Sequence, residues 1–83
     1  MDKALVNLFV PSLGEHYDVY IPVFLTVGEI SGLLARLLED LTNHQYASSG
    51  QEVLCSLDKN LLLRSESALR DYGILNGEHL MLC

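Results

Sequence analysis

The first residues of the chain alternate with the period of a β-strand. Within residues 4–10, the apolar Val6, Leu8 and Val10 fall on one face, and the polar Asn7 falls on the other. Successive side chains of a strand point to opposite faces, so a half-buried strand produces this pattern. We therefore predict a strand at Ala4–Val10 that turns its valines toward the core.

A second alternating stretch follows at Tyr17–Ile21, where Tyr17, Val19 and Ile21 share one face. The intervening segment, Pro11–His16, contains Pro and Gly and is typical of a turn. Pro22 has no N–H to donate, so we expect strand pairing to stop there. Together these features predict a β-hairpin.

The pattern then changes to helical spacing, and we predict a helix at residues 27–43. Thr26 and Glu29 have the spacing of a capping box, in which each side chain binds the other residue's backbone N–H. Apolar residues recur three and four positions apart at Val27, Ile30, Leu33, Leu34, Leu37, Leu38 and Leu41. Those expected to pack on the strands are Ile30, Leu34, Leu37 and Leu41.

The remainder of the chain returns to strands, predicted at Glu52–Leu57, Leu61–Leu63 and His79–Cys83. A helical turn is expected near Ser67–Leu69. Asn76-Gly77 is the strongest tight-turn dipeptide, because both residues tolerate positive φ. In the last strand, alternation turns Leu80 and Leu82 inward.

This order of elements indicates an α+β fold in one domain, residues 1–83. One helix covers only one face of a sheet, so a single mixed sheet is expected to wrap it. The last strand is expected beside the first and parallel to it, because the helix supplies the crossover that parallel strands require. The architecture predicted is the β-grasp, with five strands in the order 2-1-5-3-4.

Charge and composition exclude several classes of function. The net charge is −6, and the five basic residues are scattered singly, which disfavours nucleic-acid binding. Two cysteines do not make a disulfide framework. No apolar run approaches the roughly 20 residues needed to span a bilayer, and the first residues lack the features of a signal peptide. We predict a cytoplasmic protein without membrane insertion.

No catalytic, metal or cofactor site is predicted. His16, His44 and His79 lack the spacing of metal ligands. A nucleophilic Cys55 or Cys83 would need a neighbouring base and an electropositive pocket. His79 could approach Cys83 along one strand face, but both are expected on an open sheet surface, so a thiol enzyme is the least favoured hypothesis. No Gly-rich loop opens the helix to hold a phosphate. The chain is expected to be a binding protein and not an enzyme.

The segment Ser67–Ile74, followed by Asn76–Leu82, resembles the end of ubiquitin-like domains. The segment Tyr17–Pro22, followed by Thr26–Ile30 and a leucine-rich helix, is similar to the EsaB/YukD family. These are small bacterial ubiquitin-like proteins encoded with type VII (WXG100) secretion systems. The resemblance implies an accessory component that binds a protein partner in the cytoplasmic part of the secretion apparatus.

The chain ends in Leu82-Cys83 and not in the flexible Gly-Gly tail of conjugated modifiers. We therefore expect that it is not conjugated to targets. The alternative, from another class of function, is a β-grasp sulfur carrier or protein modifier that serves as co-substrate of an activating enzyme.

The outer sheet face, away from the helix, is the predicted binding surface. Alternation and the strand order place Phe9, Tyr20 and Met81 there, and Leu62 extends the patch. A contiguous aromatic and methionine patch on a small domain is typical of a contact surface. The alternative occupant of this face is a second copy of the chain, in a homodimer.

Overall fold

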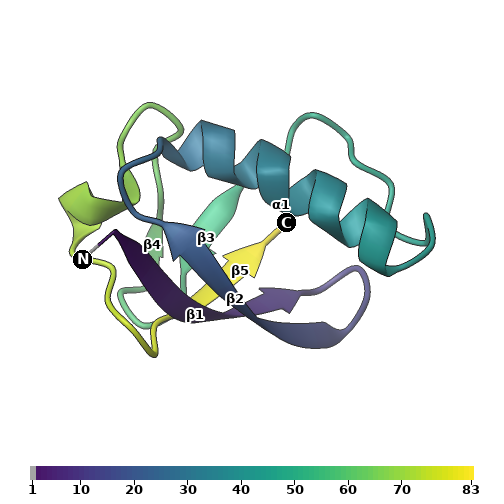
Figure 1. The fold of residues 1–83 in the computed structure, drawn as a ribbon, viewed down its shortest axis with the longest axis horizontal. Coiled ribbons are helices and arrows are strands. Elements are labelled where there is room, and N and C mark those ends of the chain that lie inside the picture. Colours follow the sequence, from purple (N-terminus) through teal and green to yellow (C-terminus); the bar gives the residue numbers. More distant parts are fainter. Residues whose placement is uncertain (1) are drawn as a thin grey trace.

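The computed structural model describes residues 2–83, and its elements follow the predicted order (Figure 1). Two helical segments are present, α1 (Val27–Leu41) and the short 3₁₀ helix η1 (Leu69–Tyr72). The strands are β1 (Lys3–Val10), β2 (Glu15–Pro22), β3 (Leu54–Ser56), β4 (Leu61–Leu62) and β5 (His79–Leu82).

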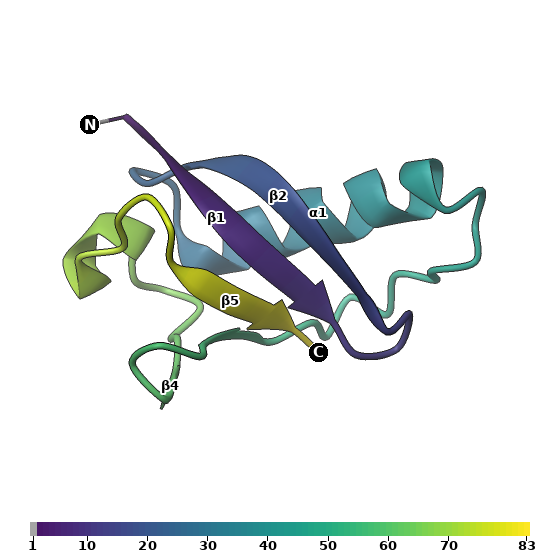
Figure 2. The same cartoon turned by 90° about the horizontal axis from the view of Figure 1, so that it is seen from below.

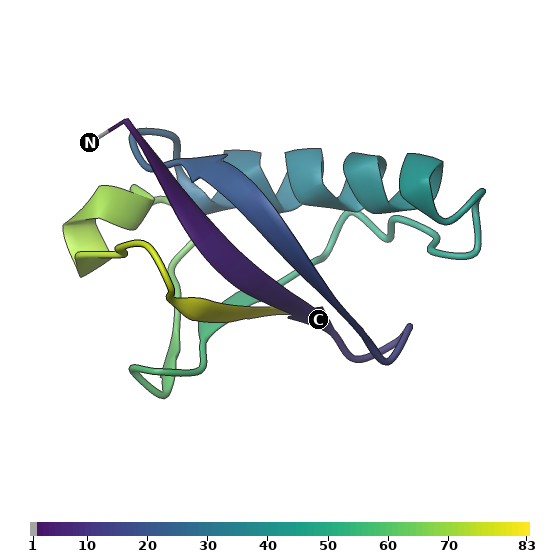
Figure 3. The ribbon, with the colours of Figure 1, turned by 60° about the horizontal axis from the view of Figure 1, so that its bottom comes forward.

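The five strands form one mixed sheet in the order β2-β1-β5-β3-β4. Strand β1 pairs antiparallel with β2 and parallel with β5, and β3 pairs antiparallel with both β5 and β4. Helix α1 lies across one face of this sheet (Figures 2 and 3). The predicted β-grasp fold and strand order are therefore confirmed.

The core lies between the inner sheet face and one arc of α1. The sheet contributes buried side chains that the alternation predicted, among them Val6, Leu8, Ile21, Leu80 and Leu82. Val19, also expected there, is only partly buried. Leu69 of η1 and the following Ile74 are buried too, and they close one end of the core.

The predicted inward face of the helix is wrong at two leucines, Leu37 and Leu41. Leu33, Leu37 and Leu41 are exposed to solvent. The arc that packs on the sheet is instead formed by Val27, Ile30, Ser31, Leu34, Ala35 and Leu38. Ser31 tolerates burial because its hydroxyl donates a hydrogen bond of 2.9 Å to the carbonyl of Val27.

Helix α1 begins as predicted but ends earlier. Thr26 Oγ1 accepts from the N–H of Glu29 (3.2 Å), and Glu29 Oε1 accepts from the N–H of Thr26 (3.0 Å), which completes the capping box. The helix stops at Leu41 and not at residue 43, because Asn43 and His44 adopt positive φ (53° and 70°). Strands β3 and β4 are also shorter than predicted, and they omit residues 52, 53, 57 and 63.

Two glycines of α1 differ in what surrounds them. A Cβ at Gly28 would lie 3.2 Å from the carbonyl oxygen of Ser65, which also accepts the Gly28 N–H at 2.9 Å. A Cβ at Gly32 would meet nothing within 4 Å. We expect Gly32→Ala to raise the free energy of unfolding by about 0.5–1 kcal/mol through helix propensity. Urea denaturation measures the change in the free energy of unfolding. Gly28→Ala is the matched control and should gain less stability, because its Cβ would press on the Ser65 carbonyl. Equal gains in the two variants would contradict the prediction.

Tyr46 anchors the loop between α1 and β3. Its hydroxyl donates to Glu52 Oε2 at 3.2 Å, and its side chain is buried. Burial, with the negative charge of Glu52, raises the pKa of Tyr46 from 10.0 to about 12. The neutral phenol is thus favoured in the folded state, so its contribution to stability is fully present below pH 10 and disappears as the pH rises through about 12.

We therefore expect one late component when the tyrosine absorbance is titrated with alkali. Tyr46→Phe removes that component, and Tyr20→Phe is the exposed control that leaves it in place. A late component that survives in Tyr46→Phe would contradict the assignment.

Candidate functional site

One row of side chains runs across the outer face of the sheet and takes a residue from every strand. In the strand registers, Phe9 lies opposite both His16 and Met81, Met81 lies opposite Cys55, and Cys55 lies opposite Leu62. All five project away from α1, because their neighbours along each strand face the core. This set is called the outer row: His16, Phe9, Met81, Cys55 and Leu62.

The outer row is organised around Phe9. The Phe9 ring stacks on the imidazole of His16, with ring centroids 4.6 Å apart and an angle of 27° between the planes. His16 Nδ1 also lies 2.9 Å from Asn7 Oδ1, which fixes the orientation of the imidazole. Phe9 and Met81 are each half-buried, and Leu62 is exposed. The result is a continuous, largely apolar strip that ends in an imidazole.

A polar row lies beside the outer row on the same face. It contains Asp18, Asn7 and His79 in register across β2, β1 and β5. Asn7 Nδ2 donates to Asp18 Oδ1 at 3.3 Å, and the His79 N–H donates to Asp58 Oδ2 at 2.8 Å. The latter bond lowers the pKa of the Asp58 carboxyl. These groups bound the apolar strip on one side with hydrogen-bonding side chains.

Tyr20 lies on the expected face but apart from the other predicted residues. It stands opposite Leu5 and is 70% exposed. The row of Asn7 and Asp18 separates it from Phe9. The structure therefore brings Phe9, Met81 and Leu62 into one row and places Tyr20 in another.

Two members of the outer row were not among the residues predicted from sequence. His16 was assigned to a turn, but β2 begins at Glu15 and includes it. Cys55 alternates with the buried Leu54 and Ser56, so alternation within residues 52–57 would have placed it outward. The missing information was where β2 begins and which residue of β3 stands opposite Met81.

Cys55 has the properties of a contact residue and not those of an activated thiol. Burial, together with the neighbouring Cys83, raises the pKa of the Cys55 thiol. Cys83 follows β5 directly, and its N–H donates to the carbonyl of Val53, just before β3, at 2.9 Å. A reactive cysteine requires a lowered pKa, so Cys55 contributes shape and apolar surface to the row.

The buried carboxylate of Glu78 is held on the other side of β5. It accepts from the Ser56 hydroxyl (3.0 Å) and from Lys59 Nζ (2.8 Å). These bonds tie the turn between β3 and β4 to the start of β5. The hydrogen bonds of this buried carboxylate are therefore satisfied within the fold, and we assign Glu78 a structural role.

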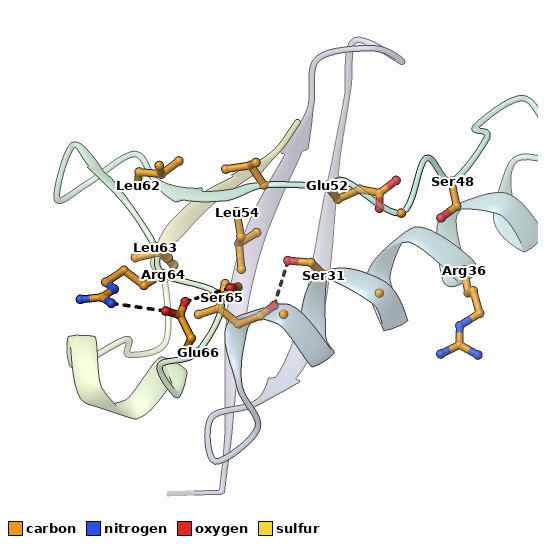
Figure 4. A pocket seen from close by; sticks show the side chains of 15 residues that line it. Ser31, Arg36, Ser48, Glu52, Leu54, Leu62, Leu63, Arg64, Ser65 and Glu66 are labelled. Carbon is orange, nitrogen blue, oxygen red and sulfur yellow. Dashed lines mark hydrogen bonds and ion pairs between the residues drawn. The ribbon is translucent and has the colours of Figure 1, made fainter.

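A groove of about 670 Å³ lies between α1 and β3, on the helix side of the sheet (Figure 4). Leu54 and Leu63 form part of its wall, and Gly28 and Gly32 line it from the helix. Two of its polar side chains are held within the fold: Arg64 Nη2 lies 3.3 Å from Glu66 Oε2, and the Ser31 hydroxyl donates to the carbonyl of Val27. The groove was not predicted, since its walls come from segments distant in sequence.

Across residues 2–83, no helix is both long enough and apolar enough to cross a membrane. Over the same residues, no group of three or more His, Cys, Asp or Glu side chains is placed to hold a metal ion.

Solved structures share this fold at low sequence identity. The EccD5 ubiquitin-like domain from Mycobacterium xenopi has a TM-score of 0.79 and 15% identity, covering 100% of this chain and 94% of that one. A chain of the MycP5-free ESX-5 inner membrane complex has a TM-score of 0.80 and 15% identity, covering 100% of this chain and 21% of that one. Caldiarchaeum subterraneum ubiquitin has a TM-score of 0.72 and 14% identity, covering 96% and 90%.

The curated proteins contain no match to this chain. The family described as WXG100 protein secretion system (Wss), protein YukD, matches residues 5–82. That span includes α1 and every residue of the outer row. It confirms the family resemblance found in the hairpin, the capping box and the last strand. The chain belongs to the YukD family of the WXG100 protein secretion system.

Proposed function

We propose that this chain is a cytoplasmic, non-catalytic component of a type VII (WXG100) secretion apparatus. In this proposal it binds another protein subunit of the apparatus through the outer row. Family membership supports the assignment to this secretion system, and the geometry of the sheet supports the choice of the outer row as the binding surface.

The observation that carries the proposal is the continuity of the outer row across all five strands. The stacked rings of Phe9 and His16 give rigid contact area, and Met81 supplies a flexible thioether that adapts to a partner's shape. The polar row of Asn7, Asp18 and His79 beside it supplies hydrogen-bonding groups at the rim. An apolar centre with a polar rim is the usual anatomy of a protein interface.

Two of the structural neighbours support the choice of partner. The EccD5 domain from Mycobacterium xenopi has the same fold, and a chain with this fold is part of the ESX-5 inner membrane complex. This chain matches 21% of that complex chain, over its own full length. We infer that the partner is a subunit of the corresponding membrane assembly.

Affinity purification tests the proposal. The tagged full chain is expressed in cells that contain a WXG100 secretion system, and detergent-solubilised membranes are passed over the affinity resin. We expect a membrane subunit of the apparatus among the bound proteins. Deleting the gene should also lower the amount of WXG100 protein in the medium, and the plasmid-borne gene should restore it. Normal secretion in the deletion strain would contradict the proposal.

In this proposal the chain binds its partner non-covalently and is not conjugated to it. Incubation of the full chain with ATP and activating enzymes, followed by intact-mass analysis, should leave its mass unchanged. An adenylate or thiocarboxylate adduct, or a ladder of conjugates in cell extracts, would instead support a sulfur carrier or modifier.

A further inference from the structure

Helix α1 carries a second apolar surface, outside the core and away from the outer row. Leu33, Leu37 and Leu41 lie on successive turns and are 48%, 42% and 60% exposed. Residues four apart on a helix are neighbours on its surface. The three side chains therefore form a continuous strip about two turns long, called here the leucine ridge.

The leucine ridge lies on the flank of α1 above β2. Successive helix residues are separated by about 100° around the axis. Gly28, Gly32 and Arg36 occupy the flank that lines the groove against β3. The ridge occupies the opposite flank, and the strand at that end of the sheet is β2, which lies near the helix in both turned views (Figures 2 and 3).

The surroundings of the ridge are mainly acidic. On α1, Glu29 stands one turn before Leu33, and Asp40 stands one turn after Leu37. Glu15 lies at the start of the neighbouring β2, and the whole chain carries a net charge of −6. Arg36 is the single basic residue within α1 and β2. A partner that covers the leucines therefore gains from positive charge at its edges.

We propose that the leucine ridge binds a basic amphipathic helix of a partner protein, separately from the outer row. A row of side chains spaced four residues apart is a ridge that fits the surface groove of a second helix. A second copy of this chain would bring the same acidic residues against it, and like charges oppose such contact. The domain could then bind two partners at once, one through the outer row of the sheet and one through the leucine ridge of α1.

The first experiment uses a synthetic helical peptide as the probe. It is about 18 residues long, which allows a stable helix, with leucines at helical spacing and lysines elsewhere. Titrated into the isotope-labelled full chain, it should shift the NMR signals of Leu33, Leu37 and Leu41. A leucine–glutamate peptide of the same pattern and a leucine–lysine peptide of alternating pattern should bind at least about tenfold more weakly.

The second experiment uses two matched triple variants of equal charge. The test variant carries Leu33→Gln, Leu37→Gln and Leu41→Gln, and it should bind the probe at least about tenfold more weakly while keeping its melting temperature. The control replaces exposed leucines elsewhere and should bind as the wild type does: Leu57→Gln, Leu61→Gln and Leu75→Gln.

Four outcomes overturn the proposal. They are equal binding by both variants, equal binding of the acidic peptide, tighter binding of the alternating peptide, and a large loss of melting temperature in the test variant. Sedimentation of the wild-type chain at rising concentration supplies a further criterion. A dimer that the test variant abolishes would assign the ridge to a second copy.

Discussion

Replacing Leu38 with Ala is expected to lower the free energy of unfolding by about 2–5 kcal/mol, whereas Leu37→Ala should cost less than about 1 kcal/mol. Leu38 is 2% exposed and Leu37 is 42% exposed, although they are neighbours in sequence and chemically identical. Truncating Leu38 removes its apolar contacts and leaves a cavity between α1 and the sheet. Truncating Leu37 leaves no such cavity, because water already reaches that side chain.

Urea denaturation of the wild type and both variants measures these differences. Because both changes are Leu to Ala in the middle of one helix, helix propensity contributes equally and cancels in the comparison. Similar losses in the two variants would mean that α1 is rotated about its axis relative to the structure described here.

Replacing Phe9 and Met81 together with Thr is expected to weaken binding to the membrane partner by about 2 kcal/mol or more, or roughly 30-fold. Thr keeps the β-propensity of β1 and β5 while removing the aromatic ring and the thioether. The two residues are directly opposite in the parallel pair β1–β5, so one contact on a partner would cover both. The melting temperature should stay within a few degrees of the wild type, since neither side chain belongs to the buried core.

Circular dichroism and quantitative pull-down from solubilised membranes measure the two effects on one preparation. The matched control is Tyr20→Thr with Leu5→Thr, a pair on the same face but beyond the polar row. Equal loss of binding in both variants would extend the site over the whole face. Full binding by the Phe9 and Met81 variant would move the site away from the outer row.

Most of the fold could be predicted from sequence, because local patterns agreed with each other. Alternation placed Val6, Leu8 and Val10 in the core, and Thr26 with Glu29 marked the first turn of α1. Asn76-Gly77 marked the turn before β5: Gly77 has a φ of 88°, and its N–H donates to the Leu5 carbonyl. The number of helices and strands then left few ways to cover the sheet.

The buried arc of α1 could not be predicted, because the helix contains two overlapping apolar stripes. One runs through Val27, Ile30, Leu34 and Leu38, and the other through Ile30, Leu33, Leu37 and Leu41. Both have helical spacing, so periodicity does not choose between them. The structure buries the first, together with Ser31 and Ala35, because small side chains fit between helix and sheet.

The outer row was predicted only in part, and the reason differs from the one that applies to α1. Alternation decides which face a residue occupies, but only the register between strands decides which residues are adjacent. Phe9 and Met81 come from strands about 70 residues apart in sequence, paired without a hairpin turn to set their alignment. Cys55 joined the row through the long-range register between β3 and β5, whereas His16 joined it because β2 begins at Glu15, earlier than predicted.

The position of β5 at the centre of the sheet has a consequence for biosynthesis. Strands β1 and β2 form a local hairpin, and β3 and β4 form another, but β5 is the strand that joins the two pairs. A chain leaving the ribosome can thus form α1 and both hairpins, but it cannot close the sheet until residues 79–82 have emerged. Until then the inner edge of β1 and the leucines of the core stay accessible to chaperones and proteases.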